Sequence, residues 1–160
     1  MRAGTALLGH FGLELDPESL SAEERVELAQ WIEWYRRDRT WLHDSRLHRL
    51  DHADATLVAW IAVARDGARA LVSAAKVATS ADAVPHPLRL AGLEHDACYR
   101  IERRSGWTGR GAAVKRSTDF LDGLPVEVPG SVLLSAGLAL PLLPPGALCF
   151  FTITRLQTKP

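Results

Sequence analysis

Leu57-Val58-Ala59-Trp60-Ile61-Ala62-Val63 is a continuous apolar run, and the turn Arg65-Asp66-Gly67 separates it from a second apolar run over residues 69–77. Apolar runs of this length between turn residues predict buried strands, and a short Asp-Gly connection between them predicts a hairpin. Helix propensity alone would favour a helix for the Ala-rich second run. The hairpin-like connection favours a strand, so we predict an antiparallel sheet around this pair.

Short segments suited to strands continue on both sides of the hairpin, divided by turn residues. We expect strands at 46–50, 56–64, 69–77, 87–91, 97–103, 130–136 and 147–154. Residues 104–128 contain several glycines and no clean period, which predicts an irregular surface connection. The apolar stretch 138–145 is interrupted by prolines, so we expect it to lie across a sheet edge.

The chain before residue 44 has a helical pattern. Ser21-Ala22-Glu23-Glu24 is a capping box, in which the Ser21 hydroxyl accepts from the backbone of Glu24 and the Glu24 carboxylate accepts from the Ser21 amide. The following residues predict a helix because apolar side chains recur at three- and four-residue spacing: Leu28, Trp31, Ile32 and Tyr35.

Two shorter elements precede this helix. Residues 10–16 alternate apolar and polar side chains, which predicts a strand that Pro17 ends. Residues 2–8 are compatible with a helix but have no capping residue before them. Together the segments predict one helix, one strand and one helix, followed by strands only.

The composition is that of an ordinary globular protein with one sizeable core. The chain has 160 residues, 19 Lys+Arg against 19 Asp+Glu, and 47% hydrophobic residues. A formal net charge of zero argues against binding to nucleic acid or anionic lipid. No apolar run is long enough to span a membrane and no secretory signal is recognisable, so we expect a cytoplasmic protein. Cys98 and Cys149 lack metal-ligand spacing and are expected to be two buried thiols, without metal or other cofactor.

Glu14 and Asp16 are the first candidates for a catalytic pair of carboxylates. Strand geometry puts both on one face about 7 Å apart, a separation compatible with paired-carboxylate glycoside hydrolysis. A carboxylate at the end of a strand, however, more commonly forms a turn, and that interpretation is favoured here.

The histidines and tryptophans also have structural interpretations that outweigh functional ones. His10 is expected to be a hydrogen-bonded structural residue. His43, His48 and His52 lie on different expected elements, so we predict no metal site from them. Four tryptophans are expected in cores, namely Trp31, Trp34, Trp41 and Trp60. Trp107 lies in a Gly-rich loop and is the candidate for stacking on a sugar face, whereas Gly109-Arg110-Gly111 lacks the lysine and helix of a phosphate loop.

The segments in combination resemble a known family. The motifs are Arg2 to Asp16, Leu20-Ser21-x-x-Glu24, Trp31-Ile32-x-x-Tyr35, Leu42-His43-x-x-Arg46, and a tail of Gly130-Ser131-Val132-Leu133 and Ala136 to Pro141. They resemble, in order, the C-terminal part of bacterial α-galactosidases of the melibiase and raffinose-hydrolase type. Leu15 stands where that family often has an aromatic residue, and Ser45 where glycine is usual.

The resemblance implies an α+β chain: residues 1–44 would be the last β/α unit of a (β/α)8 barrel, with its strand at 9–16, and residues 45–160 a C-terminal antiparallel β-sandwich. It also implies retaining hydrolysis of terminal α-galactosides such as melibiose and raffinose by two aspartates, a nucleophile and an acid/base. The motifs that carry those aspartates and hold galactose have no counterpart here, so we assign no catalytic, substrate-binding or metal-binding residue.

A single β/α unit cannot close a barrel, so its apolar side chains lack their usual partners. Leaving five of them in water, Phe11, Leu13, Leu15, Trp31 and Ile32, would forgo about 10 kcal/mol. We therefore expect the unit to be loosely held, adhesive or docked on the sandwich. The chain alone is predicted to be inactive and to pair with an N-terminal barrel portion or form a homo-oligomer. The alternative is a non-catalytic module that binds carbohydrate or completes another protein.

Overall fold

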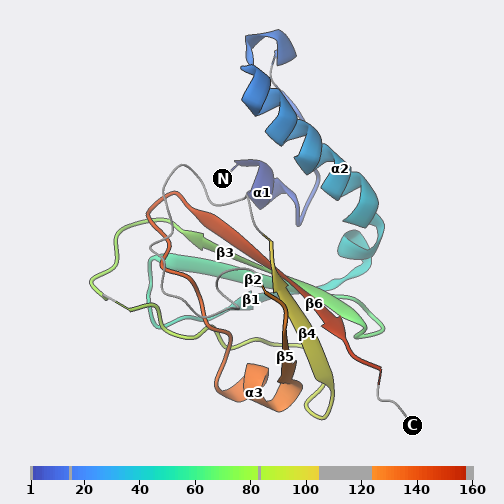
Figure 1. Ribbon diagram of the computed structural model, residues 1–160, viewed down its shortest axis with the longest axis vertical. Coiled ribbons are helices and arrows are strands. Elements are labelled where there is room, and N and C mark those ends of the chain that lie inside the picture. The colour runs from blue at the N-terminus through green and yellow to red at the C-terminus, as the bar shows by residue number, and fades with distance from the viewer. Residues whose placement is uncertain (1, 15, 83, 105–123, 158–160) are drawn as a thin grey trace.

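The computed structural model describes residues 2–14, 16–82, 84–104 and 124–157. Its helices are α1 (Arg2–Ala6), the 3-10 helix η1 (Pro17–Ser19), α2 (Ala22–Asp44) and α3 (Gly130–Ser135). Its strands are β1 (Arg46–Leu50), β2 (Leu57–Val63), β3 (Arg69–Lys76), β4 (Cys98–Arg103), β5 (Val126–Pro129) and β6 (Leu148–Arg155). All six join in one antiparallel sheet of order β1-β2-β3-β6-β4-β5 (Figure 1).

The predicted hairpin is confirmed. Ala59 pairs with Ala74 and Val63 with Ala70, so the Ala-rich run is a strand despite its helix propensity. The last strand β6 inserts between β3 and β4, which places the C-terminal apolar residues at the centre of the sheet. Burial on both faces of these central strands outweighs the local propensity of alanine.

Side chains of the central strands alternate between two cores, as the two-residue period of a strand requires. Phe151 and Ile153 point into the larger core, which also contains Ile61, Val72 and Tyr99. Their neighbours on β6 point the other way, into a smaller core under α1 and α2 whose buried members are Leu7, Trp31, Trp34, Leu42, Ala62, Leu71, Leu148 and Phe150. The sheet is therefore covered on both faces.

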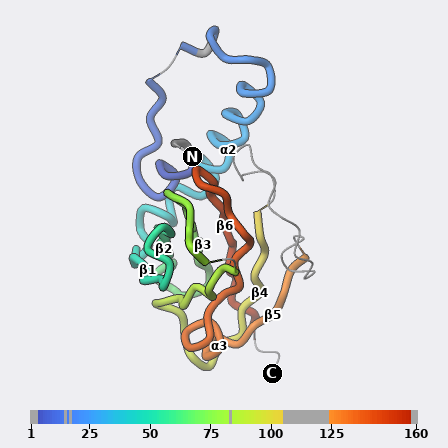
Figure 2. The backbone as a smooth tube through the Cα atoms, turned by 90° about the vertical axis from the view of Figure 1, so that its left-hand side faces the viewer, coloured from blue at the N-terminus to red at the C-terminus, as the bar shows by residue number. Residues whose placement is uncertain are grey.

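Helix α2 confirms the capping box, and of the three alternatives expected for the helical unit it shows docking on the sheet. The backbone N–H of Glu24 donates to the Ser21 hydroxyl, and that of Ser21 donates to the Glu24 carboxylate. Trp31 and Trp34 stack at 5.5 Å and both meet Phe150 of β6 edge-on. The first turns of α2, in contrast, rise away from the sheet (Figures 1 and 2), and Val26 there is 60% exposed.

The strand expected at 9–16 is wrong for the described residues, because 9–14 and 16 are not in a strand. A strand needs a hydrogen-bonded neighbour, and the described part of the chain offers this segment none. Leu13 is exposed, and Leu15 lies outside the described residues. The chain therefore shows no part of a closed barrel among its described residues.

The strand expected at 130–136 is also wrong: these residues form α3. Gly130 donates to the carbonyl of Ala97, and Ser131 donates to that of His95, so their amides are taken up by a loop rather than a ladder. A Cβ at Gly130 would lie 2.0 Å from the Glu94 carbonyl oxygen. Only glycine permits this close approach at the first residue of α3.

The face opposite α2 is covered by α3 and extended segments. Instead of the expected strand 87–91 there is one isolated bridge, Leu88 to Leu138. Strand β5 begins inside 104–128, at Val126, where we expected no regular structure. Residues 105–123 of that range are outside the described residues. The antiparallel sheet is thus confirmed, but the described second layer is less regular than a sandwich would have.

Candidate functional site

A pocket of about 240 Å³ opens beside the end of β3. Three stretches far apart in the sequence form it: the turn after β1, the loop after β3 and the proline-rich segment before β6. Its lining includes polar side chains, His52, Asp54, Lys76, Thr79, Ser80 and Asp82, and an apolar wall, Leu57, Val84, Pro85 and Leu140 to Pro145. A concave apolar site with a few convergent polar groups is the usual form of a small-molecule site.

A buried ion pair lies at the centre of this polar group. Lys76 ends β3, where its backbone is fixed by hydrogen bonds with Ala147 and Gly146. Its ammonium donates to the Asp54 carboxylate, and the two side chains are 9% and 12% exposed. The other carboxylate oxygen of Asp54 accepts from the Thr56 amide at 2.9 Å and from the Thr56 hydroxyl at 2.6 Å.

These hydrogen bonds keep Asp54 ionised. The bond from Lys76, followed by that from the Thr56 hydroxyl, holds the pKa of Asp54 well below its ordinary value, although burial acts in the opposite direction. A carboxyl group of this kind does not donate a proton near neutral pH. The pair therefore suits ligand binding or structural support rather than acid catalysis.

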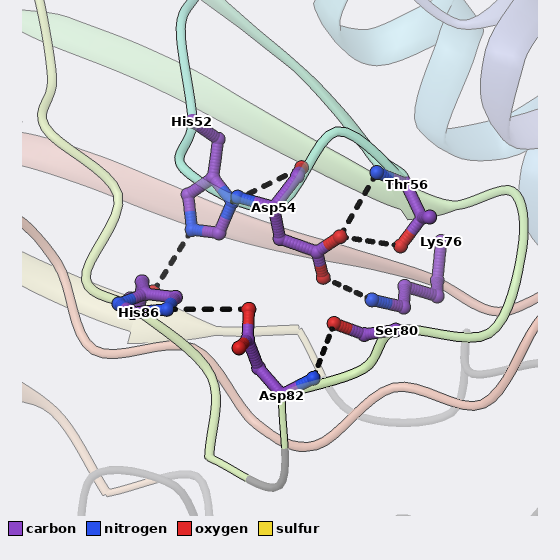
Figure 3. Close-up of polar contacts among 7 residues, drawn as sticks. All are labelled: His52, Asp54, Thr56, Lys76, Ser80, Asp82 and His86. Carbon is purple, nitrogen blue, oxygen red and sulfur yellow. Dashed lines mark hydrogen bonds and ion pairs between the residues drawn. The ribbon is translucent and has the colours of Figure 1, made fainter.

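His52 joins this pair to the loop after β3. Its Nδ1 accepts from the Asp54 amide at 3.1 Å, and its Nε2 lies 3.0 Å from the carbonyl oxygen of His86, to which it donates. His86 in turn lies 3.3 Å from the carboxylate of Asp82, and the Asp82 amide donates to Ser80 (Figure 3). The polar side of the pocket is thus one connected network.

The carboxylates that sequence reasoning singled out lie elsewhere. Asp16 accepts from the amide of Glu18 at 2.9 Å and, through its carbonyl, from Ser19, which makes it the turn former of η1. Glu14 is exposed on the segment before it. The favoured interpretation of Asp16 as a turn residue is confirmed.

The candidate histidines do not converge. The His10 ring meets His43 edge-on at 5.1 Å, and His43 Nε2 lies 2.9 Å from the Gly9 carbonyl, so both hold residues 9–10 against the end of α2. His48 lies on β1 and His52 in the pocket. The described residues contain no group of three or more His, Cys, Asp or Glu that would hold a metal ion.

The tryptophans and cysteines mostly have structural environments. Trp31 and Trp34 are buried, whereas Trp41 and Trp60 are half-buried, and Arg69 stacks on the Trp41 ring at 4.7 Å. Trp107 and the stretch Gly109-Arg110-Gly111 lie outside the described residues. Both cysteines are free; burial raises the pKa of the Cys149 thiol to about 12, while Cys98 is only half-buried.

The pocket itself was missed by the sequence reasoning, which treated residues 51–54 as a turn and Lys76 as part of a strand. One signal was available. A lysine that ends an otherwise apolar strand needs a buried anion, because a lone buried ammonium is costly. The identity of that anion, Asp54, depends on pairing between β2 and β3 that the sequence pattern does not specify.

Comparison with known proteins identifies the family of this chain. Residues 57–152, from the start of β2 into β6, match the glycosyl hydrolase family 36 C-terminal domain. The chain belongs to this family. The match covers the hairpin, most of the pocket lining and all but the end of the last strand, whereas β1 and the pocket residues His52 and Asp54 lie before it.

Relatives extend the similarity into the helical part. The chain is 35% identical over 114 residues to the bifunctional α-galactosidase/sucrose kinase AgaSK of Mediterraneibacter gnavus, covering 71% of this chain and 12% of that protein. It is 29% identical over 158 residues to an α-galactosidase of Escherichia coli, covering 96% of this chain and 22% of that protein. The chain thus spans less than a quarter of either relative.

Crystal structures agree with the sequence comparison. A variant of the GH36 α-galactosidase AgaA from Geobacillus stearothermophilus, in complex with raffinose, superposes with a TM-score of 0.76 at 26% identity. The superposition covers 97% of this chain and 19% of that enzyme. No helix among the described residues is both long and apolar enough to cross a membrane.

Proposed function

We propose that this chain is the C-terminal portion of a cytoplasmic, retaining α-galactosidase that hydrolyses terminal α-galactosides such as melibiose and raffinose. The observation that carries the proposal is the superposition, which covers 97% of this chain but 19% of an α-galactosidase. In this proposal residues 1–44 are the last unit of a (β/α)8 barrel and residues 45–160 are the sheet domain that follows it.

The uncovered surface of the helical part supports this assignment. The first turns of α2 project beyond the sheet (Figure 2). Val26 and Leu13 are exposed, and residues 10–14 are extended without a strand partner. A last barrel strand and helix separated from the other strands would look like this, since barrel strands are paired on both sides and covered by helices.

We further propose that the chain alone is inactive because its catalytic aspartates lie outside these 160 residues. Retaining glycosidases need two carboxyl groups about 5 Å apart, one as nucleophile and one as acid/base. Asp16 is engaged in a turn, and Asp54 is held by Lys76 and Thr56. In both cases the hydrogen bonds give the carboxylate a structural role.

Hydrolysis of p-nitrophenyl α-galactoside by the purified chain tests the proposal. The chain alone should give no turnover, and a mixture with a separately produced N-terminal portion carrying barrel strands one to seven should give turnover. A full-length α-galactosidase is the positive control. A combined E14Q and D16N variant is the matched control for local carboxylates, since both residues are exposed and the asparagine side chain keeps an oxygen that can accept from the Glu18 amide.

Turnover by the chain alone would overturn the claim of inactivity, provided that the hydrolytic activity elutes together with the 160-residue protein. Loss of that turnover in the E14Q/D16N variant would assign the chemistry to the segment before η1. Absence of turnover in every mixture, with both portions folded, would contradict the role in an α-galactosidase.

A further inference from the structure

We propose that the pocket beside the end of β3 binds a small, neutral polyhydroxyl ligand of about one pyranose unit. The inference does not rest on the proposed hydrolysis. It rests on the buried ammonium of Lys76, on the charge balance of the lining and on the size of the pocket.

Lys76 supplies unused hydrogen-bond donors at a buried position. An ammonium group has three N–H donors. Among the described residues its one hydrogen-bond partner is Asp54, and the side chain is only 9% exposed. Figure 3 shows the ammonium between Asp54 and the Ser80 loop. A ligand oxygen in the pocket would satisfy donors that bulk water reaches poorly.

The energetics of the Lys76–Asp54 ion pair also favour a role in ligand binding. Replacing a buried ion pair by apolar residues is often neutral or stabilising, so stability alone is a weak reason to have one. Here the pair lines a pocket together with leucine and proline side chains rather than lying in closed packing. This arrangement presents polar and apolar surface to the same ligand.

The charge balance selects a neutral ligand. With neutral histidines the lining carries one positive charge, Lys76, and two negative charges, Asp54 and Asp82, which leaves a formal charge of −1. The net negative charge of the lining disfavours an anion. Hydroxyl groups of a neutral ligand can both accept from the Lys76 ammonium and donate to the Asp82 carboxylate. The C–H face of a sugar ring would pack on the apolar wall formed by Leu140 to Pro145.

The size of the pocket limits the ligand to one ring. Its volume of about 240 Å³ lies below the range of about 300–1,000 Å³ that accommodates drug-sized ligands. A neutral ligand of this size in an open pocket should bind with a dissociation constant on the order of 1 mM.

Titration of the ¹⁵N-labelled chain with D-galactose, followed by amide chemical shifts, tests the inference. We expect saturable shifts at Lys76, Ser80 and Asp82, and affinity for D-galacturonate at least tenfold weaker because of its carboxylate. V84W should lower the affinity for galactose at least tenfold by filling the pocket mouth. V77W is the matched control, since Val77 is 54% exposed, Val84 is 51% exposed and only Val84 lines the pocket.

Several results would overturn the inference. These are no saturable shift at a hundredfold excess over the expected dissociation constant, shifts confined to other parts of the sheet, equal effects of V84W and V77W in folded variants, or tighter binding of galacturonate. Shifts of the pocket residues with the N-terminal enzyme portion but not with sugar would instead identify it as a protein contact. Because no hydrolysis is measured, failure here leaves the test of the proposed function unaffected.

Discussion

Truncation of Phe150 tests the docking of α2 on the sheet. Phe150 is fully buried on β6 and meets the rings of Trp31 and Trp34 edge-on at 5.8 and 5.0 Å. Replacing a buried phenylalanine with alanine costs about 3–5 kcal/mol, and each aromatic pair contributes about 0.5–1.5 kcal/mol beyond its buried area. Because both ring contacts are lost, we expect F150A to lower the free energy of unfolding by about 4–5 kcal/mol, the upper part of the range for this substitution. For a chain of this length that corresponds to a fall in Tm of roughly 8–20 °C.

The neighbouring Phe151 provides a matched control. It is equally buried but faces the opposite core, away from α2. Both variants should lose stability in urea unfolding followed by circular dichroism. Only F150A should shift tryptophan emission to the red in the native state and increase amide hydrogen exchange in α2, because it removes the ring on which the two tryptophans rest. A loss below about 1 kcal/mol, or equal effects of both variants on α2, would refute the aromatic docking.

The remaining predictions concern the ion pair and a close approach of backbone. D54N or K76M alone should lower the free energy of unfolding in urea by about 3–5 kcal/mol, because a buried charge loses its partner. The double variant should be nearly as stable as wild type, and losses that simply add would contradict this. Because folding lowers the pKa of Asp54, its contribution is full above the unfolded pKa of about 4 and is lost as pH falls below it; the stability difference between wild type and D54N should therefore shrink in acid, which unfolding curves at several pH values measure. G130A should cost about 3 kcal/mol or more in the same assay, since its Cβ would meet the Glu94 carbonyl at 2.0 Å. G12A is the control and should be neutral, because a Cβ at Gly12 would have nothing within 4 Å.

Local signals in the sequence predicted much of the fold. The capping box fixed the start of α2, and the Asp-Gly turn between two apolar runs identified the hairpin of β2 and β3 against the helix propensity of alanine. Both signals act over a few residues, where sequence spacing determines which atoms meet. The three- and four-residue spacing of apolar side chains did not, however, include Trp34, which is buried beside Trp31.

Features that depend on distant segments were not predictable in this way. The alternating pattern at 10–16 specifies a strand only where neighbouring strands pair with it. Gly130 at the start of α3 is packed closely against the Glu94 carbonyl, a contact between residues far apart in the chain. The pocket combines the turn after β1, the end of β3 and the segment before β6, so no single stretch of sequence carries its chemistry.

The two ends of α2 have different environments, and this bears on how the chain would join a larger enzyme. The middle and C-terminal part of the helix is fixed on the sheet by Trp31, Trp34 and Leu42. The N-terminal third, around Val26, has no such cover (Figure 1). Because one end of α2 is packed on the sheet, the position of the sheet determines where the other end of the helix lies, and so where a further segment could pack on it. In the proposed enzyme the sheet would hold the last barrel helix in place through the aromatic contact with Phe150. Loss of that contact should therefore weaken assembly with an N-terminal portion even where the sheet itself stays folded.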